Sequence, residues 1–179
     1  SGITIDDGVT LRNGTLNFSA CTADQFIQAH GTLGSSNDLT ANASYAAASV
    51  SLTSVSGLAA NDLLSLYDSS DYVDGLNRGE IVEIESIASL VVTLHGGVRD
   101  SYATASSAAV KKITTIDDVT LDVLTVIGAE SVSGTRSVVS LRNCRRARLS
   151  NLDIRAIDNY AISVAGCFDT KIHDVTIRD

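Results

Sequence analysis

The chain has 179 residues but no methionine, proline or tryptophan, and only 4% of its residues are aromatic. Because translation begins at methionine, this absence predicts a processed product or, preferably, a segment of a longer protein. No apolar run approaches the roughly 20 residues that span a bilayer, and no hydrophobic stretch of a secretory signal opens the chain. These absences argue against insertion into a membrane.

Cysteine and positive charge are also scarce. Three cysteines, an odd number, do not form a disulfide framework, and their spacing supports no metal site. No cofactor is expected. The net charge is −8, with 5 basic and 12 acidic residues in residues 1–112 but 8 and 9 in residues 113–179. Negative charge, no RNA-binding motif and no interleaved aromatic side chains together argue against a nucleic-acid ligand.

Two stretches near the C-terminus repeat each other at a spacing of 23 residues. The residues Val139, Leu141, Cys144, Leu149, Leu152 and Ile154 correspond to Ile162, Val164, Cys167, Ile172, Val175 and Ile177. Short alternating apolar runs with this period, and without the 3.6-residue period of a helix, predict a right-handed parallel β-helix. We expect these apolar side chains to point inward and to stack in ladders, because successive coils lie about 4.8 Å apart.

The same pattern occurs in earlier parts of the chain. Residues 121–126 match residues 149–154 at an offset of 28, and we place the five extra residues in a loop at residues 130–136. Residues 11–16 repeat the pattern once more, and residues 24–29 read as the first strand of a further coil. Asn13, Asn151 and Asp174 then share a bend, where Asx side chains tolerate left-handed geometry.

The period is lost after Gly31 and returns near Ile113. Turn-forming clusters separate five short alternating runs in this interval, at residues 50–54, 62–67, 79–86, 90–95 and 108–112. These runs predict a small antiparallel, β-barrel-like domain inserted into the solenoid. The predicted organisation of this all-β chain is therefore first coils at 1–31, the insert at 32–112 and further coils at 113–179. No capping element covers Asp179, so the solenoid is expected to continue beyond it.

The order of several segments resembles a known family. These segments are FSACTADQFIQAHG (18–31), AASVSLTSVSGLAANDLLSLYD (47–68), GEIVEIESI (79–87), LVVTLHGGVRDSY (90–102) and AAVKKITTIDDVTLDVLTV (108–126). This order resembles the N-terminal part of pectate-lyase-like parallel β-helix proteins of the phage tailspike and polysaccharide-depolymerase type. In that family a small β-domain commonly interrupts an early coil. The resemblance covers nearly the whole chain but is architectural, so it implies a fold and leaves the chemistry open.

Arginines form the densest cluster of charge in the sequence. They are Arg136, Arg142, Arg145, Arg146, Arg148 and Arg155. We expect Arg155 and Arg178 to stack in adjacent coils on an outer face, with Asp153 compensating their repulsion. Arg155, Arg178 and the nearby Tyr160 are the predicted polysaccharide-binding residues. A solvated surface or a subunit interface is the alternative for this face.

The sequence gives less evidence for catalytic residues than for binding residues. Glycoside hydrolysis needs two carboxyl groups about 5 to 9.5 Å apart, and Asp153 and Asp158 are the candidates. Asp158 and Asn159 also fit an ordinary turn. The motifs that the resemblance would imply are missing, because the chain has neither the proline-containing arginine motif of pectate lyases nor the Gly-His-Gly and Arg-Ile-Lys runs of polygalacturonases. His30 is predicted to be structural, and the segment alone is predicted to be non-catalytic.

Three functions fit these observations. The leading hypothesis is the N-terminal segment of a homotrimeric virion tailspike that recognises a bacterial surface polysaccharide, contacts other tail proteins and, when complete, depolymerises the glycan. The second is a secreted bacterial polysaccharide lyase or hydrolase, and the third is a non-enzymatic structural or adhesin β-helix. The expected location is a virion tail or the extracellular space.

Overall fold

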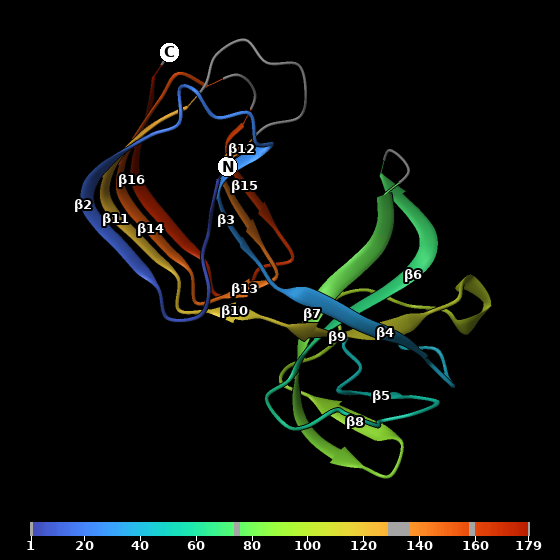
Figure 1. Cartoon of the computed structure of the whole chain (residues 1–179). Coiled ribbons are helices and arrows are strands. Elements are labelled where there is room, and N and C mark those ends of the chain that lie inside the picture. Colours follow the sequence, from blue (N-terminus) through green and yellow to red (C-terminus); the bar gives the residue numbers. More distant parts are fainter. Residues whose placement is uncertain (1, 74–75, 129–136, 158–159, 179) are drawn as a thin grey trace. The chain divides into compact units, whose positions relative to one another are not determined.

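We describe a computed structural model that covers residues 2–73, 76–128, 137–157 and 160–178. The predicted loop at residues 130–136, Arg136 and the Asp158-Asn159 turn lie outside these residues. The described chain is built of β-strands and one 3-10 turn, Thr104–Ser106, and none of its helices could span a membrane. It divides into two compact units, one formed by residues 1–32 with 115–179 and one by residues 33–114 (Figure 1). Below they are called unit 1 and unit 2.

Unit 1 consists of parallel sheets that succeed one another along the chain. The first contains β1 (Ile3–Thr4), β3 (Gln25–His30), β12 (Ser137–Arg142) and β15 (Tyr160–Ala165); the second contains β2 (Thr10–Asn17), β11 (Thr120–Ile127), β14 (Arg148–Arg155) and β16 (Lys171–Arg178); the third contains β10 (Ile116–Asp117) and β13 (Cys144–Arg145). The chain passes from sheet to sheet and then adds its next strand beside the previous one (Figure 1). This is the β-helix arrangement that the repeat predicts.

In unit 1, residues that correspond in the sequence repeat lie opposite each other on paired strands. The predicted pairs face each other, namely Val139 with Ile162, Leu141 with Val164, Leu149 with Ile172, Leu152 with Val175 and Ile154 with Ile177. The offset of 28 pairs Leu121 with Leu149, and Leu11 in turn pairs with Leu121. The register predicted from the sequence is therefore confirmed across four strands of the second sheet.

A ladder of left-handed residues bends the second sheet. Asn13, Val123, Asn151 and Asp174 have φ angles of 57°, 53°, 52° and 53°, and strand pairing skips all four positions. Asn and Asp reach this conformation at low cost because their short polar side chains bond nearby backbone groups. The predicted bend positions are confirmed, and Val123 is the one member that this chemistry does not favour.

The core of unit 1 is the interior of the coils. Val139, Leu149 and Ile154 are fully buried, and such burial stabilises by about 1.5 to 3 kcal/mol per aliphatic side chain. In contrast, Val164, Ile172 and Ile177 are 42%, 43% and 54% exposed. These three lie on β15 and β16, which each pair with a neighbour on one side alone. The predicted pairing of these three residues is correct, although they are much less buried than their partners Leu141, Leu149 and Ile154.

Cys144 and Cys167, which correspond in the repeat, also lie side by side in unit 1. Cys144 is fully buried, and its backbone N–H donates to the Sγ of Cys167 at 3.3 Å. Both are free thiols, as is Cys21.

Unit 2 contains a six-stranded sheet. The strands lie in the order β4 (Thr32–Asp38), β9 (Ala109–Thr114), β6 (Leu63–Val73), β7 (Leu76–Ala88), β8 (Val91–Leu94) and β5 (Ser49–Ser51). The pairs of β6 with β7 and β9, and of β8 with β5 and β7, are antiparallel. A strand lies at each of the five predicted places, whereas β4 was not predicted. An antiparallel bridge between Leu39 and Leu52 links the segments that follow the two edge strands.

Candidate functional site

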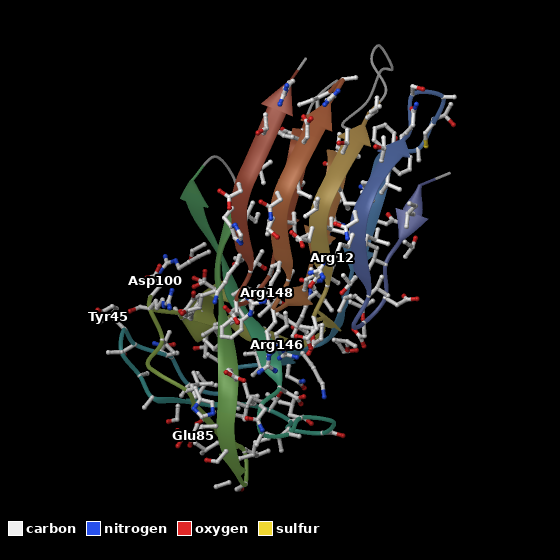
Figure 2. All side chains as sticks on the ribbon, turned by 90° about the vertical axis from the view of Figure 1, so that its left-hand side faces the viewer. Arg12, Tyr45, Glu85, Asp100, Arg146 and Arg148 are labelled. Carbon is white, nitrogen blue, oxygen red and sulfur yellow. The ribbon has the colours of Figure 1, made fainter. Side chains whose placement is uncertain are left out.

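Alternation along the second sheet separates an inner from an outer face. In β14, Leu149, Leu152 and Ile154 are buried, whereas the residues between them are not. The outward positions form rows across the four strands, which are Thr10–Thr120–Arg148–Lys171, Arg12–Asp122–Ser150–His173, Thr15–Thr125–Asp153–Thr176 and Asn17–Ile127–Arg155–Arg178. We call these residues the outer face, and Figure 2 views the sheet from this side.

The outer face has the opposite charge to the chain as a whole. It includes five basic side chains and two carboxylates, whereas the whole chain has a net charge of −8. A positive surface concentrates anionic ligands and steers their approach. Its remaining side chains are mostly hydroxyl and amide groups, which can donate to and accept from a polyhydroxylated ligand.

Asp153 lies between the two predicted binding arginines. Arg155 donates to Oδ2 of Asp153 through Nε, at 3.0 Å, and through Nη2, and the Nε of Arg178 lies 3.4 Å from Oδ1. The hydrogen bonds from Arg155, together with the charge of Arg178, lower the pKa of the Asp153 carboxyl. The predicted compensation is thus confirmed.

The same geometry bears on the catalytic candidates. A general acid must hold a proton near neutral pH, which requires a raised pKa. Asp153 has the opposite shift, and both of its oxygens face guanidinium groups. The arrangement suits a fixed anion that orients two arginines. The other candidate, Asp158, lies outside the described residues.

A second carboxylate, that of Asp122, bonds several side chains in and beside the row Arg12–Asp122–Ser150–His173. Asp122 accepts hydrogen bonds from Ser150 Oγ at 2.8 Å and from Asn151 Nδ2 at 3.0 Å, and it pairs with Arg12 Nε at 3.1 Å. The bonds from Asn151 and then Ser150, with a smaller contribution from Arg12, lower the pKa of Asp122. The sequence analysis missed this network because Arg12 and Asp122 are 110 residues apart. The match of Leu11 to Leu121 was the signal that could have placed them side by side.

The arginine cluster does not form one patch. Arg142 lies on β12 and Arg145 on β13, so among the described members Arg148 and Arg155 alone belong to the outer face. Arg146 occupies a corner with a φ of 56°, where its guanidinium pairs with Asp117 and Asp118 at 2.9 and 2.8 Å. Its role there is to stabilise the corner.

The remaining candidates lie elsewhere. Tyr160 is 52% exposed but begins β15, so it belongs to a different sheet from Arg155 and Arg178. His30 Nε2 lies 2.9 Å from the Oγ of the buried Ser140, and burial, together with the charge of Arg142, lowers the pKa of His30. Within the described ranges, no three His, Cys, Asp or Glu side chains gather as a metal site would require.

Comparison with solved structures identifies the fold. The chain matches the Gp54 tailspike of Acinetobacter baumannii bacteriophage AP22, solved with A. baumannii capsular saccharide, at a TM-score of 0.64 and 14% identity over 97% of this chain and 39% of that one. It also matches the tailspike gp61 of Pseudomonas phage phi297, at a TM-score of 0.63 and 14% identity over 99% of this chain and 37% of that one. A third match is the tailspike gp49 of Pseudomonas phage LKA1, at a TM-score of 0.60 and 17% identity over 97% of this chain and 39% of that one. No family model matches the chain, and no curated protein matches it by sequence.

These matches bear out the sequence resemblance at the level of fold. The chain has the parallel β-sheet architecture of phage tailspike proteins and spans about two fifths of the length of the tailspikes it matches. Identity of 14 to 17% carries no information about individual site residues.

Proposed function

We propose that this chain is part of a tailspike-type protein and that its outer face contacts an acidic bacterial surface polysaccharide. The observation that carries the proposal is the positive outer face on a tailspike-like coil, with Arg155 and Arg178 held in place by Asp153. Planar guanidinium groups bind carboxylates through two parallel hydrogen bonds. The AP22 tailspike, which has the same fold, was solved with a capsular saccharide.

We infer that the chain is an N-terminal segment of a homotrimer on a virion tail, where it also contacts other tail proteins. Residues 32–112 would then be a barrel-like domain inserted into a right-handed solenoid, which the antiparallel pairing within unit 2 and the Leu39–Leu52 bridge support. The two units alternate along the sequence in the order that such an insertion requires.

The segment is proposed to bind without cleaving. Asp153 is held as an anion, and the outer face contains one further carboxylate, Asp122, which is occupied by three donors. Depolymerisation would then be a property of the complete protein.

The test measures binding and turnover together. The chain is applied to an array of acidic and neutral bacterial capsular polysaccharides, and release of reducing or unsaturated ends is followed alongside mass by light scattering. We expect an acidic polysaccharide to be retained without release of ends, and an Arg155→Ala/Arg178→Ala variant to bind it at least tenfold more weakly. Arg142→Ala, an exposed arginine of the first sheet, is the matched control.

Three results would contradict the proposal. These are retention of neutral polysaccharides alone, unchanged binding by the double variant, or robust release of ends by the segment. Added salt should weaken binding to the outer face, because the attraction between exposed charges decays over about 10 Å at an ionic strength of 0.1 M and over shorter distances at higher salt.

A further inference from the structure

Unit 2 contains a pocket that lies apart from the outer face in the sequence. It has a volume of about 260 Å³ and is lined by Arg78, Gly79 and Glu80 of β7 and by Arg99, Asp100 and Tyr102 of the loop that follows β8. Pockets for drug-sized ligands usually measure about 300 to 1,000 Å³. This one therefore suits a single ring with its substituents.

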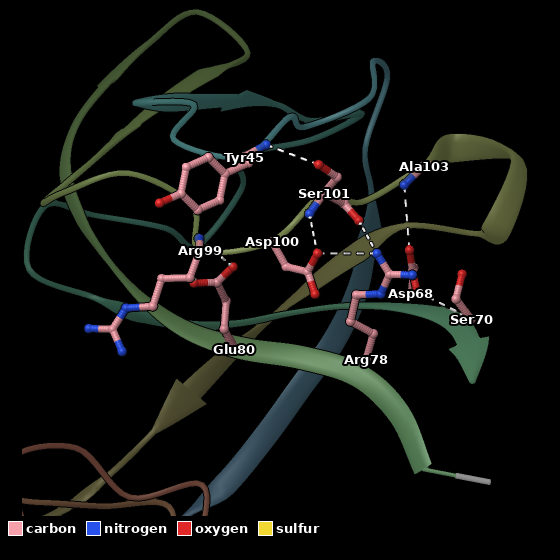
Figure 3. Close-up of polar contacts among 9 residues, drawn as sticks. All are labelled: Tyr45, Asp68, Ser70, Arg78, Glu80, Arg99, Asp100, Ser101 and Ala103. Carbon is pink, nitrogen blue, oxygen red and sulfur yellow. Dashed lines mark hydrogen bonds and ion pairs between the residues drawn. The ribbon is translucent and has the colours of Figure 1, made fainter. Parts of the chain in front are cut away.

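The pocket is held open by contacts that a ligand need not supply. The backbone N–H of Arg99 donates to both oxygens of Glu80, at 2.9 and 3.0 Å. Arg78 Nη1 donates to the backbone oxygen of Ser101 at 2.7 Å and to Asp100 Oδ1 at 3.3 Å (Figure 3). Because the loop is fixed by these bonds, binding would order few additional groups.

Tyr102 is the buried residue of the pocket lining. It is 1% exposed; its backbone N–H donates to the Ala43 oxygen at 2.8 Å, and its backbone oxygen accepts from the Ala43 N–H at 2.9 Å. Burial, together with its hydrogen bond to Glu80 and the charge of that carboxylate, raises the pKa of Tyr102, so its hydroxyl stays protonated.

Several polar groups of this pocket have no partner among the described residues. Arg78 Nε is buried and makes no hydrogen bond. The Arg99 side chain is exposed, and none of its contacts with described residues engages the guanidinium, since its bonds to Glu80 are made by the backbone. Asp100 uses Oδ1 for its bonds to Ser101 and Arg78, which leaves Oδ2 available. Among the described residues, the Arg99 guanidinium and Asp100 Oδ2 are therefore the groups of this pocket that remain available to a ligand.

An exposed aromatic residue lies beside the loop that lines the pocket. Tyr45 is 72% exposed, and its backbone N–H donates to Ser101 Oγ at 3.1 Å. Ala43 pairs with Tyr102, so the antiparallel run places Tyr45 opposite the Arg99–Asp100 segment. Figure 3 shows the Tyr45 ring and the Arg99 side chain extending to the same side of the ribbon.

We propose that this pocket binds one acidic sugar unit, with the sugar ring packed on Tyr45, a sugar carboxylate paired with Arg99, and hydroxyl groups bonded to Asp100 and Arg78. The apolar C–H face of a pyranose covers a flat aromatic ring, and vicinal hydroxyls match a carboxylate beside a guanidinium. A free guanidinium at the rim selects for a carboxylate substituent. The choice of a sugar as ligand rests on the proposed function, whereas the residues involved are independent of the outer face.

The experiment titrates the full chain, labelled with ¹⁵N, with methyl glucuronoside and with methyl glucoside. Amide shifts report where each sugar binds. We expect shifts at Tyr45, Arg99 and Asp100, and an affinity for the glucuronoside at least tenfold above that for the glucoside. Arg99→Ala should abolish that preference, and Tyr45→Ala should weaken both sugars about tenfold. Both side chains are exposed, so neither variant should disturb the fold.

Two controls separate this pocket from the outer face. His95→Ala changes an exposed side chain of the same unit and should leave the titration unchanged. The Arg155→Ala/Arg178→Ala variant, which removes two arginines of the outer face, should also leave the titration of the pocket unchanged. No saturable shift with either sugar, a preference that survives Arg99→Ala, or shifts confined to the outer face would each overturn the inference. Failure of the outer-face variant alone would count against the proposed function only.

Discussion

The side-chain amide of Asn151 donates a hydrogen bond to Oδ1 of Asp122, on the neighbouring strand β11, at 3.0 Å. Asn151 reaches this carboxylate from the left-handed bend, where its φ is 52°. The bend thus does two things, because it turns the sheet and places a donor beside an outward carboxylate. Val123 occupies the same bend on β11, with a φ of 53°, and has no side-chain donor to offer.

Val123→Asn should stabilise the protein. A β-branched side chain in the left-handed region is strained, and this conformation costs ordinary L-residues roughly 1 to 2 kcal/mol. Val123 is 48% exposed, so its replacement removes little buried apolar surface. We expect a gain of about 1 kcal/mol in the free energy of unfolding, measured by urea denaturation. Thr125→Asn, two residues along the same strand, is the control and should give no gain.

Two members of one ladder should respond differently to truncation. Ile154 is fully buried on β14, and Ile177, its partner on β16, is 54% exposed. Ile154→Ala should cost about 2 to 5 kcal/mol in the free energy of unfolding, because it leaves a cavity within the coils. Ile177→Ala should cost clearly less. Equal losses in urea denaturation would show that the two positions do not differ in burial in solution.

The repeat predicted the register of unit 1 because stacked coils require equivalent residues to align. It could not predict how well each residue is covered, since burial depends on whether a strand has neighbours on both sides. Val139 and Ile162 therefore share a rung with different exposure. Strand β4 escaped prediction because Thr32–Asp38 has no apolar alternation, and six of its seven residues are exposed.

The site was predictable where adjacent repeats align. Arg155 and Arg178 are related by the 23-residue spacing, and Asp153 lies two residues before Arg155, so their contact followed from the sequence. Arg12 and Asp122 are separated by the whole of unit 2, which hides their relation. The pocket around Arg78 and Arg99 depends on loop geometry that no period describes.

The stability contributed by Asp122 should depend on pH. Its folded-state pKa is lowered, first by Asn151 and Ser150, so its contribution is full above the ordinary Asp value near 3.9 and is lost as the pH falls through the folded pKa. Asp122→Asn should therefore be less stable than the wild type at pH 7, by an amount that shrinks below about pH 4. Urea denaturation between pH 3 and pH 7 measures this. A difference of the same size at both ends would show that the charge of Asp122 is irrelevant.

Unit 1 should fold without residues 33–114, because the ends that would have to be joined meet at one residue. The backbone N–H of Gly31 donates to the backbone oxygen of Arg142, and the backbone oxygen of Gly31 accepts from Asn143 Nδ2 at 3.2 Å. The backbone N–H of Ile116 donates to the backbone oxygen of the same Asn143 at 3.2 Å. A short Gly-Ser link between Thr32 and Thr115 therefore closes a small gap, and closing a short flexible loop costs little entropy.

We expect the shortened chain to give a β-rich circular dichroism spectrum and one cooperative urea transition. Its m-value should be smaller than that of the full chain, since less surface is exposed on unfolding. Ile154→Asp in the shortened chain is the control and should abolish the transition, because it buries an unpaired carboxylate among the coils. A shortened chain that aggregates or unfolds without cooperativity would mean that the coils need unit 2 to fold.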